Sequence, residues 1–433
     1  SEFLWTPVGT TQHPFRGYLI GVDSEDTCTT PLVNISGSDT TTDYVVIKSV
    51  IANEPNADYV GFFGHIESAR IIGIQLTGAL VRGAQYSAAM AADSRNSKIA
   101  GCKVDSEEDD ATATIITTHY VSGGLVAKSE NDSLTKNLHV GAKFVGDAVY
   151  TGGMVGTGKS SKVYNNYTYV NIRNNALYQG SIAGSMDGVA PTNRLFRAKT
   201  SANYGQIVNN YARVKNDGRP ERVGGVAGYS KNTVIENNYV YGDLTGSAVS
   251  GAVAAVADQG TNADYNYYET GSTNATVGQQ RSGASVATTV AFKGSGNQVA
   301  LASEAYGVDN LTRALNRWVR DHGNGDYLTW RSDLDGRNGG YPVFGTPDLI
   351  PVSNTIAIHG CDSIIYDGRS YTDGESLTVH VVDSVEMIDS TSTLFFYVGH
   401  SSYESHTDTG HVGMPYSGYG FYLSPTETEL LRS

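Results

Sequence analysis

Two short phrases recur along the chain at a nearly fixed spacing. The first is small-small-aliphatic, as in Gly224-Gly225-Val226, and the second ends in Asn-Asn-Tyr, as in Asn237-Asn238-Tyr239. Successive aliphatic residues of the first phrase lie 27, 35, 29, 28, 44 and 27 positions apart, at Phe63, Met90, Leu125, Met154, Ile182, Val226 and Val253. A repeat of this length is typical of stacked supersecondary units, here with two insertions.

The repeating units are predicted to be extended rather than helical. Gly-Gly pairs, Asn-Asn pairs and β-branched or aromatic residues are poor in helix interiors, and no stripe with a period of about 3.6 residues runs through the units. Short strands separated by Gly and Asn corners fit this composition. We therefore predict an all-β fold, a right-handed parallel β-helix (solenoid) in which equivalent positions stack about 4.8 Å apart.

Equivalent side chains of successive coils should form columns. We predict an amide ladder and, beside it, an aromatic stack, formed by Asn166, Asn210 and Asn238 and by Tyr167, Tyr211 and Tyr239. The tyrosines are expected to point into the solenoid. Degenerate copies of the second phrase end at Cys102, Leu138 and Tyr267, which assigns Cys102 to the tyrosine column as a buried residue and argues against a disulfide scaffold.

The two phrases together resemble the GLUG repeat of bacterial surface proteins and of some immunoglobulin A protease precursors. The opening segments 5–9, 14–17 and 60–66 and the closing segments 314–318 and 340–344 are similar to the two ends of such arrays. The resemblance covers roughly residues 1 to 346. It implies the solenoid architecture and a secreted or cell-surface protein, whereas the repeat occurs in proteins of different activities.

The later part of the chain is predicted to hold one helix and a second domain. Residues 309–322 have apolar side chains at helical spacing, with Asp309 as the N-cap and Gly323 as the stop. The segment 346–351 is the expected boundary between a solenoid domain, residues 1–346, and a small β-rich domain, residues 352–433. Clean alternation at 376–381 and a strong strand pattern at 393–398 support the second domain.

Composition narrows the classes of partner. The 433-residue chain has 50 glycines and 28 tyrosines, which suits repetitive β structure better than disorder, and its net charge of −14 disfavours nucleic acid. No run approaches about 18 consecutive apolar residues, so no transmembrane segment is expected. The opening SEFLWT lacks a leader, which fits a cytosolic protein or a secreted one whose leader lies outside this sequence; the resemblance favours the second.

The two insertions carry the candidate binding residues, because loops on rigid scaffolds often hold function. The first insertion is acidic and offers oxygen ligands for calcium at Asp105, Glu107 and Asp109. The alternative is a solvated acidic loop. The second insertion is basic and aromatic and offers contacts to a glycan or an acidic partner at Arg194, Phe196, Arg197, Lys199 and Tyr204. The alternative is charge balance at the surface. No cofactor other than calcium is expected.

The function predicted from these features is a non-catalytic adhesin or binding scaffold that recognises an extracellular glycan or protein. One alternative is a polysaccharide lyase or glycosidase that uses the solenoid wall, but acids such as Asp187, Glu236 and Asp243 are scattered rather than paired. Another is a structural stalk, which predicts a wall without aromatic side chains. Exposed tyrosines would favour glycan binding, since sugar rings stack on aromatic faces.

Overall fold

The computed structural model describes two compact units, Ser1–Gly345 and Thr346–Ser433. In the first unit the described residues are 4–21, 45–104, 114–189, 204–273, 275–296, 299–323, 325–333, 336 and 338–345, without the side chains of 138–141. In the second unit they are the backbones of the strands named below. Each unit is described by itself.

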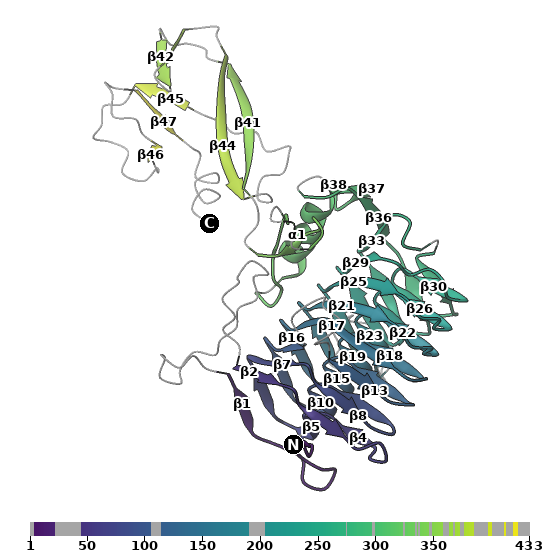
Figure 1. The fold of residues 1–433 in the computed structure, drawn as a ribbon. Coiled ribbons are helices and arrows are strands. Elements are labelled where there is room, and N and C mark those ends of the chain that lie inside the picture. The colour runs from purple at the N-terminus through teal and green to yellow at the C-terminus, as the bar shows by residue number, and fades with distance from the viewer. Residues whose placement is uncertain are drawn as a thin grey trace. The chain divides into compact units, whose positions relative to one another are not determined.

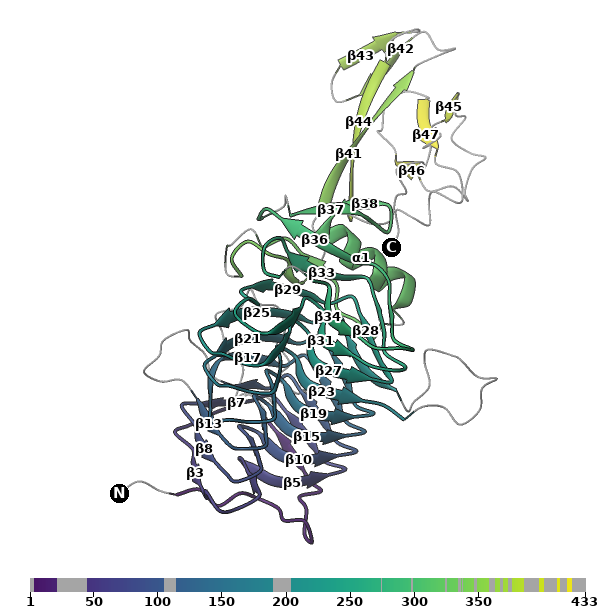
Figure 2. The ribbon, with the colours of Figure 1, turned by 90° about the vertical axis from the view of Figure 1, so that its right-hand side faces the viewer.

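The first unit is a parallel β-solenoid, which confirms the predicted fold class (Figures 1 and 2). Each coil visits up to four sheets in turn, numbered 1 to 4 in the order in which the chain reaches them. One coil contains β14 (Val121–Gly123), β15 (Val126–Glu130), β16 (Ser133–Thr135) and β17 (Leu138–Val145). Each of these strands pairs in parallel with its counterpart in the next coil.

The other strands of sheets 1 and 2 follow the same pattern. Sheet 1 also contains β4 (Tyr59–Val60), β9 (Tyr86–Ala88), β18 (Tyr150–Gly152), β22 (Tyr178–Gly180), β26 (Arg222–Gly224) and β30 (Val249–Gly251). Sheet 2 also contains β5 (Phe63–Glu67), β10 (Ala91–Arg95), β19 (Val155–Lys159), β23 (Ala183–Asp187), β27 (Ala227–Lys231), β31 (Ala254–Ala257) and β34 (Val277–Gln280).

Sheets 3 and 4 complete the coils. Sheet 3 also contains β1 (Tyr18–Ile20), β6 (Arg70–Ile72), β11 (Lys98–Ala100), β20 (Lys162–Tyr164), β24 (Gly205–Val208), β28 (Thr233–Glu236), β32 (Asn262–Asp264) and β35 (Ser285–Val286). Sheet 4 also contains β2 (Val45–Lys48), β3 (Ile51–Asn53), β7 (Ile74–Thr77), β8 (Leu80–Arg82), β12 (Lys103–Val104), β13 (Ile115–Thr117), β21 (Tyr167–Ile172), β25 (Tyr211–Asn216), β29 (Tyr239–Gly242), β33 (Asn266–Glu269), β36 (Thr289–Lys293), β37 (Ala300–Ala305) and β38 (Val308–Asn310).

The corner between sheets 1 and 2 explains the glycine pair of the first phrase. A Cβ on Gly152 would lie 1.8 Å from the carbonyl oxygen of Val155, and one on Gly153 would lie 2.0 Å from that of Ser181. Only glycine permits this approach of two backbones. The aliphatic residue that follows, such as Met154, is fully buried in the solenoid core.

The predicted first member of the aliphatic column, Phe63, is wrong by one residue. Phe63 pairs with Ala91, so Phe62 rather than Phe63 stands one coil before Met90. The first step is therefore 90 − 62 = 28 residues, in line with the common period. The sequence Phe62-Phe63 offers two large residues in succession, and only the pairing register distinguishes them.

A ladder of asparagine side chains lies at the corner between sheets 3 and 4. Asn166 Nδ2 donates to Asn210 Oδ1 at 3.0 Å, and Asn210 Nδ2 donates to Asn238 Oδ1 at 2.9 Å. Asn137 and Asn266 extend the same column by one coil on each side. Each amide therefore bonds to its counterpart in the next coil, as the repeat phrase predicts for this column.

Cys102 belongs to this asparagine column, so its assignment to the tyrosine column is wrong. Its backbone N–H donates to Asn137 Oδ1 at 2.9 Å, whereas the next residue, Lys103, pairs with Leu138. The phrase in this coil ends one residue later than its apolar pattern suggests. Cys102 is fully buried and is the free cysteine of the described residues.

The tyrosine stack exists, but it lies on the outside of sheet 4. The rings of Tyr167 and Tyr211 are 4.5 Å apart, and those of Tyr211 and Tyr239 are 5.3 Å apart. Side chains alternate along a strand, so Ala212, which packs in the solenoid core, directs Tyr211 outward. The expectation that the tyrosines point inward is therefore wrong; they are covered by Trp330 and Phe344.

The stretch from α1 to β40, residues 311–344, covers the tyrosine stack and is called the covering segment. α1 (Leu311–His322) buries Leu311, Ala314, Leu315, Trp318 and Val319, the apolar face predicted for it. Its N-cap is Asn310 rather than Asp309, because Asn310 Oδ1 accepts from the N–H of Arg313 at 3.2 Å. Gly323 ends the helix as predicted, and β39 (Trp330–Arg331) and β40 (Val343–Phe344) complete the segment.

A ladder of alternating charge runs along sheet 2. Strand pairing brings together residues of opposite sign in the order Glu67, Arg95, Glu130, Lys159, Asp187 and Lys231. Lys159 Nζ lies 2.9 Å from Glu130 Oε1, and beyond this set Arg281 Nη1 lies 2.8 Å from Asp258 Oδ2. The term charge ladder is used below for these eight residues.

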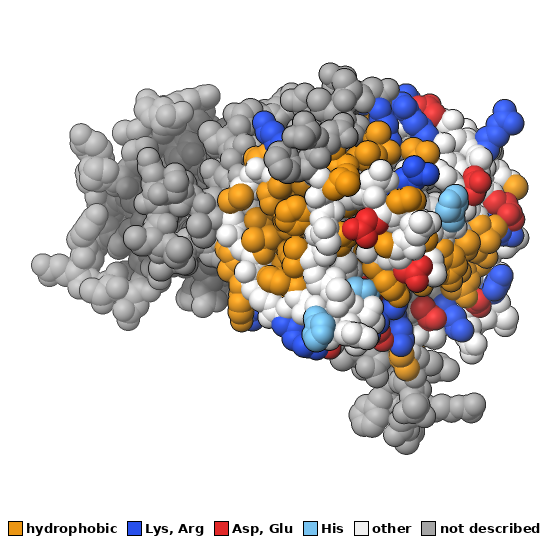
Figure 3. Space-filling model, turned by 60° about the horizontal axis from the view of Figure 1, so that its bottom comes forward, with side chains coloured by type: hydrophobic (Ala, Val, Ile, Leu, Met, Phe, Trp, Pro, Cys, Tyr) orange, Lys and Arg blue, Asp and Glu red, His pale blue; other side chains and the backbone are white. Residues whose placement is uncertain are grey.

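The first coils form an open end of the solenoid. Apolar side chains gather on this end in Figure 3. The exposed large apolar side chains among the described residues of the first coils are Leu4, Val8, Tyr18, Ile20, Val45 and Val46. Strands β1 and β2 each pair with a single described strand, β6 and β7. At the other end the parallel stacking gives way to the antiparallel pairs of β36, β37 and β38.

The second unit consists of antiparallel strand pairs. β41 (Leu349–Ala357) pairs with β44 (Ser376–Ser384), and β42 (Ser363–Tyr366) pairs with β43 (Arg369–Thr372). β47 (Tyr419–Tyr422) lies between β45 (Tyr397–His400) and β46 (His411–Val412). The alternating run 376–381 lies in β44, whereas most of the run 393–398 lies outside the described residues.

Candidate functional site

Most of the site residues predicted in the two insertions lie outside the described residues. These are the calcium candidates Asp105, Glu107 and Asp109 and the basic and aromatic candidates Arg194, Phe196, Arg197 and Lys199. Tyr204 is described and is partly buried against the aromatic cluster under the covering segment. No group of three or more metal-ligating side chains occurs within the part of the chain that the structure describes.

A row of tyrosines follows the outer side of sheets 1 and 2, and sequence reasoning missed it. The term tyrosine stripe is used for Tyr59, Tyr86, Tyr120, Tyr150, Tyr178 and Tyr229. The rings of Tyr59 and Tyr86 stack at 4.9 Å, and those of Tyr150 and Tyr178 stack at 5.3 Å. Edge contacts of 5.6, 6.5 and 5.7 Å join the remaining neighbours along the stripe.

The repeat itself positions these rings. Tyr150 and Tyr178 each stand two residues before the first glycine of the first phrase and pair directly with each other. The residues between, Thr151 and Gln179, are fully buried, so strand alternation turns the tyrosines outward. Tyr59 and Tyr86 pair at the same offset, so a repeated tyrosine at this position is the signal in the sequence for four of the six rings. Tyr120 stands one residue earlier, and Tyr229 lies in β27.

The tyrosines of the stripe are partly exposed and have neighbouring cations. Tyr120 is 41% exposed, and the other five rings are partly exposed. Lys128 Nζ lies 5.8 Å from the centre of the Tyr86 ring, and Arg222 Cζ lies 5.1 Å from that of Tyr178. Burial raises the pKa of Tyr86 and Tyr150 above the usual value for a phenol, so both rings remain neutral at physiological pH.

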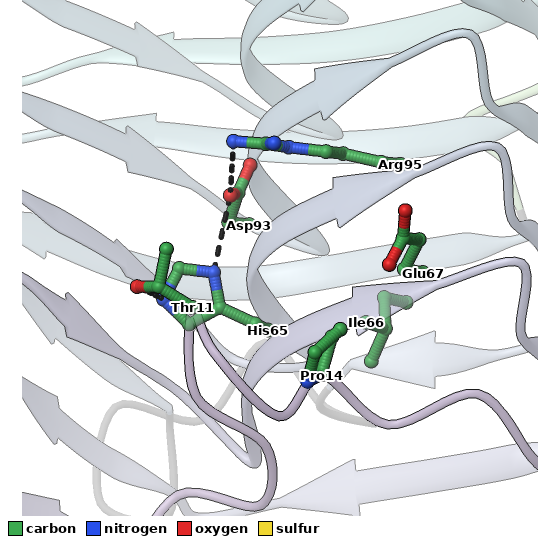
Figure 4. A pocket seen from close by; sticks show the side chains of 7 residues that line it. All are labelled: Thr11, Pro14, His65, Ile66, Glu67, Asp93 and Arg95. Atoms are coloured by element: carbon green, nitrogen blue, oxygen red, sulfur yellow. Dashed lines mark hydrogen bonds and ion pairs between the residues drawn. The ribbon is translucent and has the colours of Figure 1, made fainter.

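A small hollow with titratable side chains lies at one end of the stripe (Figure 4). Its cavity volume is about 30 Å³, enough to admit a water molecule. The residues that line it are Thr11, Pro14, His65, Ile66, Glu67, Asp93 and Arg95. The His65 ring lies 4.3 Å from the ring of Tyr59, so the stripe and the hollow are continuous.

Hydrogen bonds link three side chains in this hollow. Thr11 Oγ1 lies 3.0 Å from His65 Nε2, and His65 Nδ1 lies 3.1 Å from Asp93 Oδ2. His65 and Asp93 are paired positions of β5 and β10, 28 residues apart, whereas Thr11 comes from the segment that precedes the first coils. The repeat therefore supplies two members of the chain of hydrogen bonds, and the opening segment supplies the third.

Asp93 is ionised at neutral pH. Burial raises the pKa of this carboxyl, but the hydrogen bond from His65 and the charges of Lys128 and Arg95 outweigh burial and bring the pKa below its usual value. Arg95 Nη2 lies 3.1 Å from Asp93 Oδ2, and Lys128 Nζ lies 3.6 Å from Oδ1. An ionised Asp93 accepts hydrogen bonds only, so Nδ1 of His65 carries the proton.

Comparisons with protein-family models, curated proteins and solved structures find no match to this chain. The resemblance to the GLUG repeat therefore stays a prediction. Within the described residues, no helix combines the length and the apolar character needed to cross a membrane; α1 has 12 residues.

Proposed function

We propose that this chain is an extracellular or cell-surface binding scaffold of the adhesin type, whose tyrosine stripe binds an extended glycan. The observation that carries the proposal is the row of partly exposed rings at successive coils, with contacts of 4.9 and 5.3 Å between stacked neighbours. Neutral, partly exposed aromatic rings at successive coils offer an extended surface on which sugar rings can pack. The resemblance to GLUG surface proteins supports the location.

The tyrosine stripe favours a binding scaffold over a structural stalk. A stalk that only spaces other domains predicts a wall without aromatic side chains, whereas the outer side of sheets 1 and 2 carries six tyrosines. Binding on the stripe requires no cleavage of the glycan backbone. A lyase or glycosidase remains the competing assignment, and its products make it directly testable.

The test is a screen of immobilised glycans with the wild type, Tyr150→Ala and Tyr18→Ala, with calcium and with a chelator. Tyr150 lies within the stripe, whereas Tyr18 is 68% exposed on β1 and serves as the matched control. Loss of one stacked ring should weaken binding by about 0.5–1.5 kcal/mol, a few-fold to about tenfold in affinity. Calcium dependence would assign a role to Asp105, Glu107 and Asp109.

Two results would overturn the proposal. Equal binding by the wild type and by Tyr150→Ala, or equal loss in Tyr18→Ala, would remove the stripe as the binding surface. New reducing ends or unsaturated uronates after incubation with acidic or neutral polysaccharides would favour the lyase or glycosidase. If either product appears, its formation should be lost when an acid of the solenoid wall, such as Asp243, is replaced.

A further inference from the structure

We propose that Thr11, His65 and Asp93 form an acyl-transfer site that hydrolyses esters of small carboxylic acids. Thr11 is the nucleophile, His65 the general base and Asp93 the residue that orients the imidazole. This activity goes beyond glycan binding and does not depend on it. The three side chains come from separate segments and converge on one hollow that is open to solvent (Figure 4).

The geometry meets the requirement for an activated hydroxyl. The two links, 3.0 Å from Thr11 Oγ1 to His65 Nε2 and 3.1 Å from His65 Nδ1 to Asp93 Oδ2, are both within the reach of about 2.6–3.2 Å expected between nucleophile, base and orienting group. His65 and Asp93 are buried, which fixes their positions, whereas Thr11 is exposed at the mouth. A substrate therefore meets the hydroxyl first.

The protonation states set the direction of proton transfer. Because Asp93 is ionised and accepts from Nδ1 of His65, Nε2 of the neutral imidazole carries a lone pair that faces the Thr11 hydroxyl. Nε2 is therefore placed to take the hydroxyl proton. The charge of Asp93 stabilises the imidazolium that results, as in other arrangements of hydroxyl, imidazole and carboxylate.

The reaction balances with water as the only co-reactant. Thr11 Oγ1 attacks the carbonyl carbon of the ester while its proton passes to His65 Nε2; the carbonyl–alkoxide bond then breaks, and the alcohol leaves with that proton. Water next attacks the acyl group on Thr11, gives one proton to His65 and forms the carboxylic acid, and the proton returns to Thr11 Oγ1. The hollow beside these atoms is large enough to admit a water molecule, and Arg95 lines it with positive charge.

The size of the hollow limits the acyl group. The hollow is small, with a cavity volume of about 30 Å³, so an ester of a small acyl group such as acetyl is the one that fits it best. The alcohol part of the substrate faces solvent or the neighbouring ring of Tyr59. An acetyl ester on a small soluble alcohol is therefore the simplest probe.

The experiment follows hydrolysis of p-nitrophenyl acetate together with the intact mass of the protein. The wild type should release p-nitrophenol with turnover and carry a transient acetyl group, located on Thr11 by peptide mapping after acid quench. Thr11→Val and His65→Gln should lose the adduct and at least about 10²-fold in rate, the contribution typical of a positioned base. Thr11→Ser should retain both.

Three controls separate catalysis from a structural role of the same hydrogen bonds. His13→Gln removes an exposed histidine near Thr11 that lies outside the hollow, and it should leave adduct and rate unchanged. Tyr18→Ala removes an exposed ring outside both the hollow and the tyrosine stripe and should keep the esterase activity of the wild type. The ester assay and the glycan screen use different readouts, so the two proposals fail independently. Melting temperatures verify that each variant is folded.

The proposal is overturned if the wild type forms no acetyl adduct, if the adduct maps to a residue other than Thr11, or if Thr11→Val hydrolyses the ester at the wild-type rate. In each of these outcomes the hydrogen bonds only fasten the opening segment to the solenoid.

Discussion

The two adjacent asparagines of the second phrase have different tasks. Asn210 belongs to the internal ladder, whereas Asn209 has a positive φ of 55° and faces the covering segment. Asparagine tolerates this left-handed conformation better than most residues. Asn209 Nδ2 donates to the carbonyl of Leu328 at 3.0 Å, and its Oδ1 accepts from Trp330 Nε1 at 2.9 Å. Asn209 Nδ2 also donates to Asn165 Oδ1, and Asn209 Oδ1 accepts from Asn237 Nδ2, each at 2.7 Å. Both asparagines thus join neighbouring coils, and Asn209 in addition attaches the cover.

Asp132 should make stability depend on pH. Burial, partly offset by hydrogen bonds from Ser129 and Ser97, raises the pKa of this carboxyl to about 7. The folded state therefore binds the proton more tightly than the unfolded chain, where the pKa is about 3.9. The contribution of Asp132 to the free energy of unfolding is fully present below about pH 4 and is lost as the pH rises through about 7.

The prediction is checked with Asp132→Asn, which keeps an acceptor for the Ser97 N–H. Between pH 5 and pH 8 the melting temperature of the wild type should fall relative to that of the variant. Parallel curves for the two proteins would contradict the raised pKa of Asp132.

At the scale of elements, the covering segment and sheet 4 share one aromatic cluster. Tyr211 lies between its neighbours in the stack and the rings of Trp330 and Phe344, at 5.6 and 5.2 Å. The second core of the solenoid domain is thus built outside the coils, by tyrosines from the repeat, by α1 and by the segment after it. This arrangement buries one wall and leaves the tyrosine stripe on another partly open.

Removal of a ring from this second core should be costly. Tyr211→Ala is a large-to-small change at a buried site and should lower the free energy of unfolding by roughly 3–5 kcal/mol. Tyr120→Ala, at a ring that is 41% exposed, should change it by less than about 1 kcal/mol. Denaturant midpoints of the two variants check the difference, and equal losses would argue against the covering role of the segment.

The sequence predicts which residues stack on one another better than it predicts whether their side chains point into or out of the solenoid. Asn166, Asn210 and Asn238 could be aligned because their offsets repeat, but the outward direction of Tyr211 depends on how many residues each corner consumes. Thr11 and His65 are 54 residues apart, and Thr11 lies outside the repeat, so no period signals the link between them. The spacing of residues in the sequence predicts which positions stack. The contacts between the opening segment and the coils depend on the three-dimensional fold and leave no repeat in the sequence.

For the solenoid as a whole, the charge ladder contributes to the order of the coils. Its side chains are partly exposed, so each pair contributes at most about 1 kcal/mol, and screening by salt reduces that further. Its value lies in the repeated pattern, because opposite signs meet between neighbouring coils from Glu67 to Lys231.

Reversal of one sign should reveal this contribution. Lys159→Glu places a third carboxylate between Glu130 and Asp187 and should destabilise the fold by about 0.2–1 kcal/mol for each like-charged contact. The melting temperature should recover partly at high salt, because salt screens the repulsion between exposed carboxylates. A loss that is independent of salt would point to packing of the lysine stem instead.

The alternation along sheet 2 also sets the unit in which such a protein can change its length. Backbone pairing and the asparagine ladder repeat once per coil, so either would accept the deletion or duplication of a single coil. The charges repeat once every two coils, and removal of the coil that carries Lys159 would bring Glu130 against Asp187. Growth or shortening of this wall by recombination should therefore be tolerated best in pairs of coils.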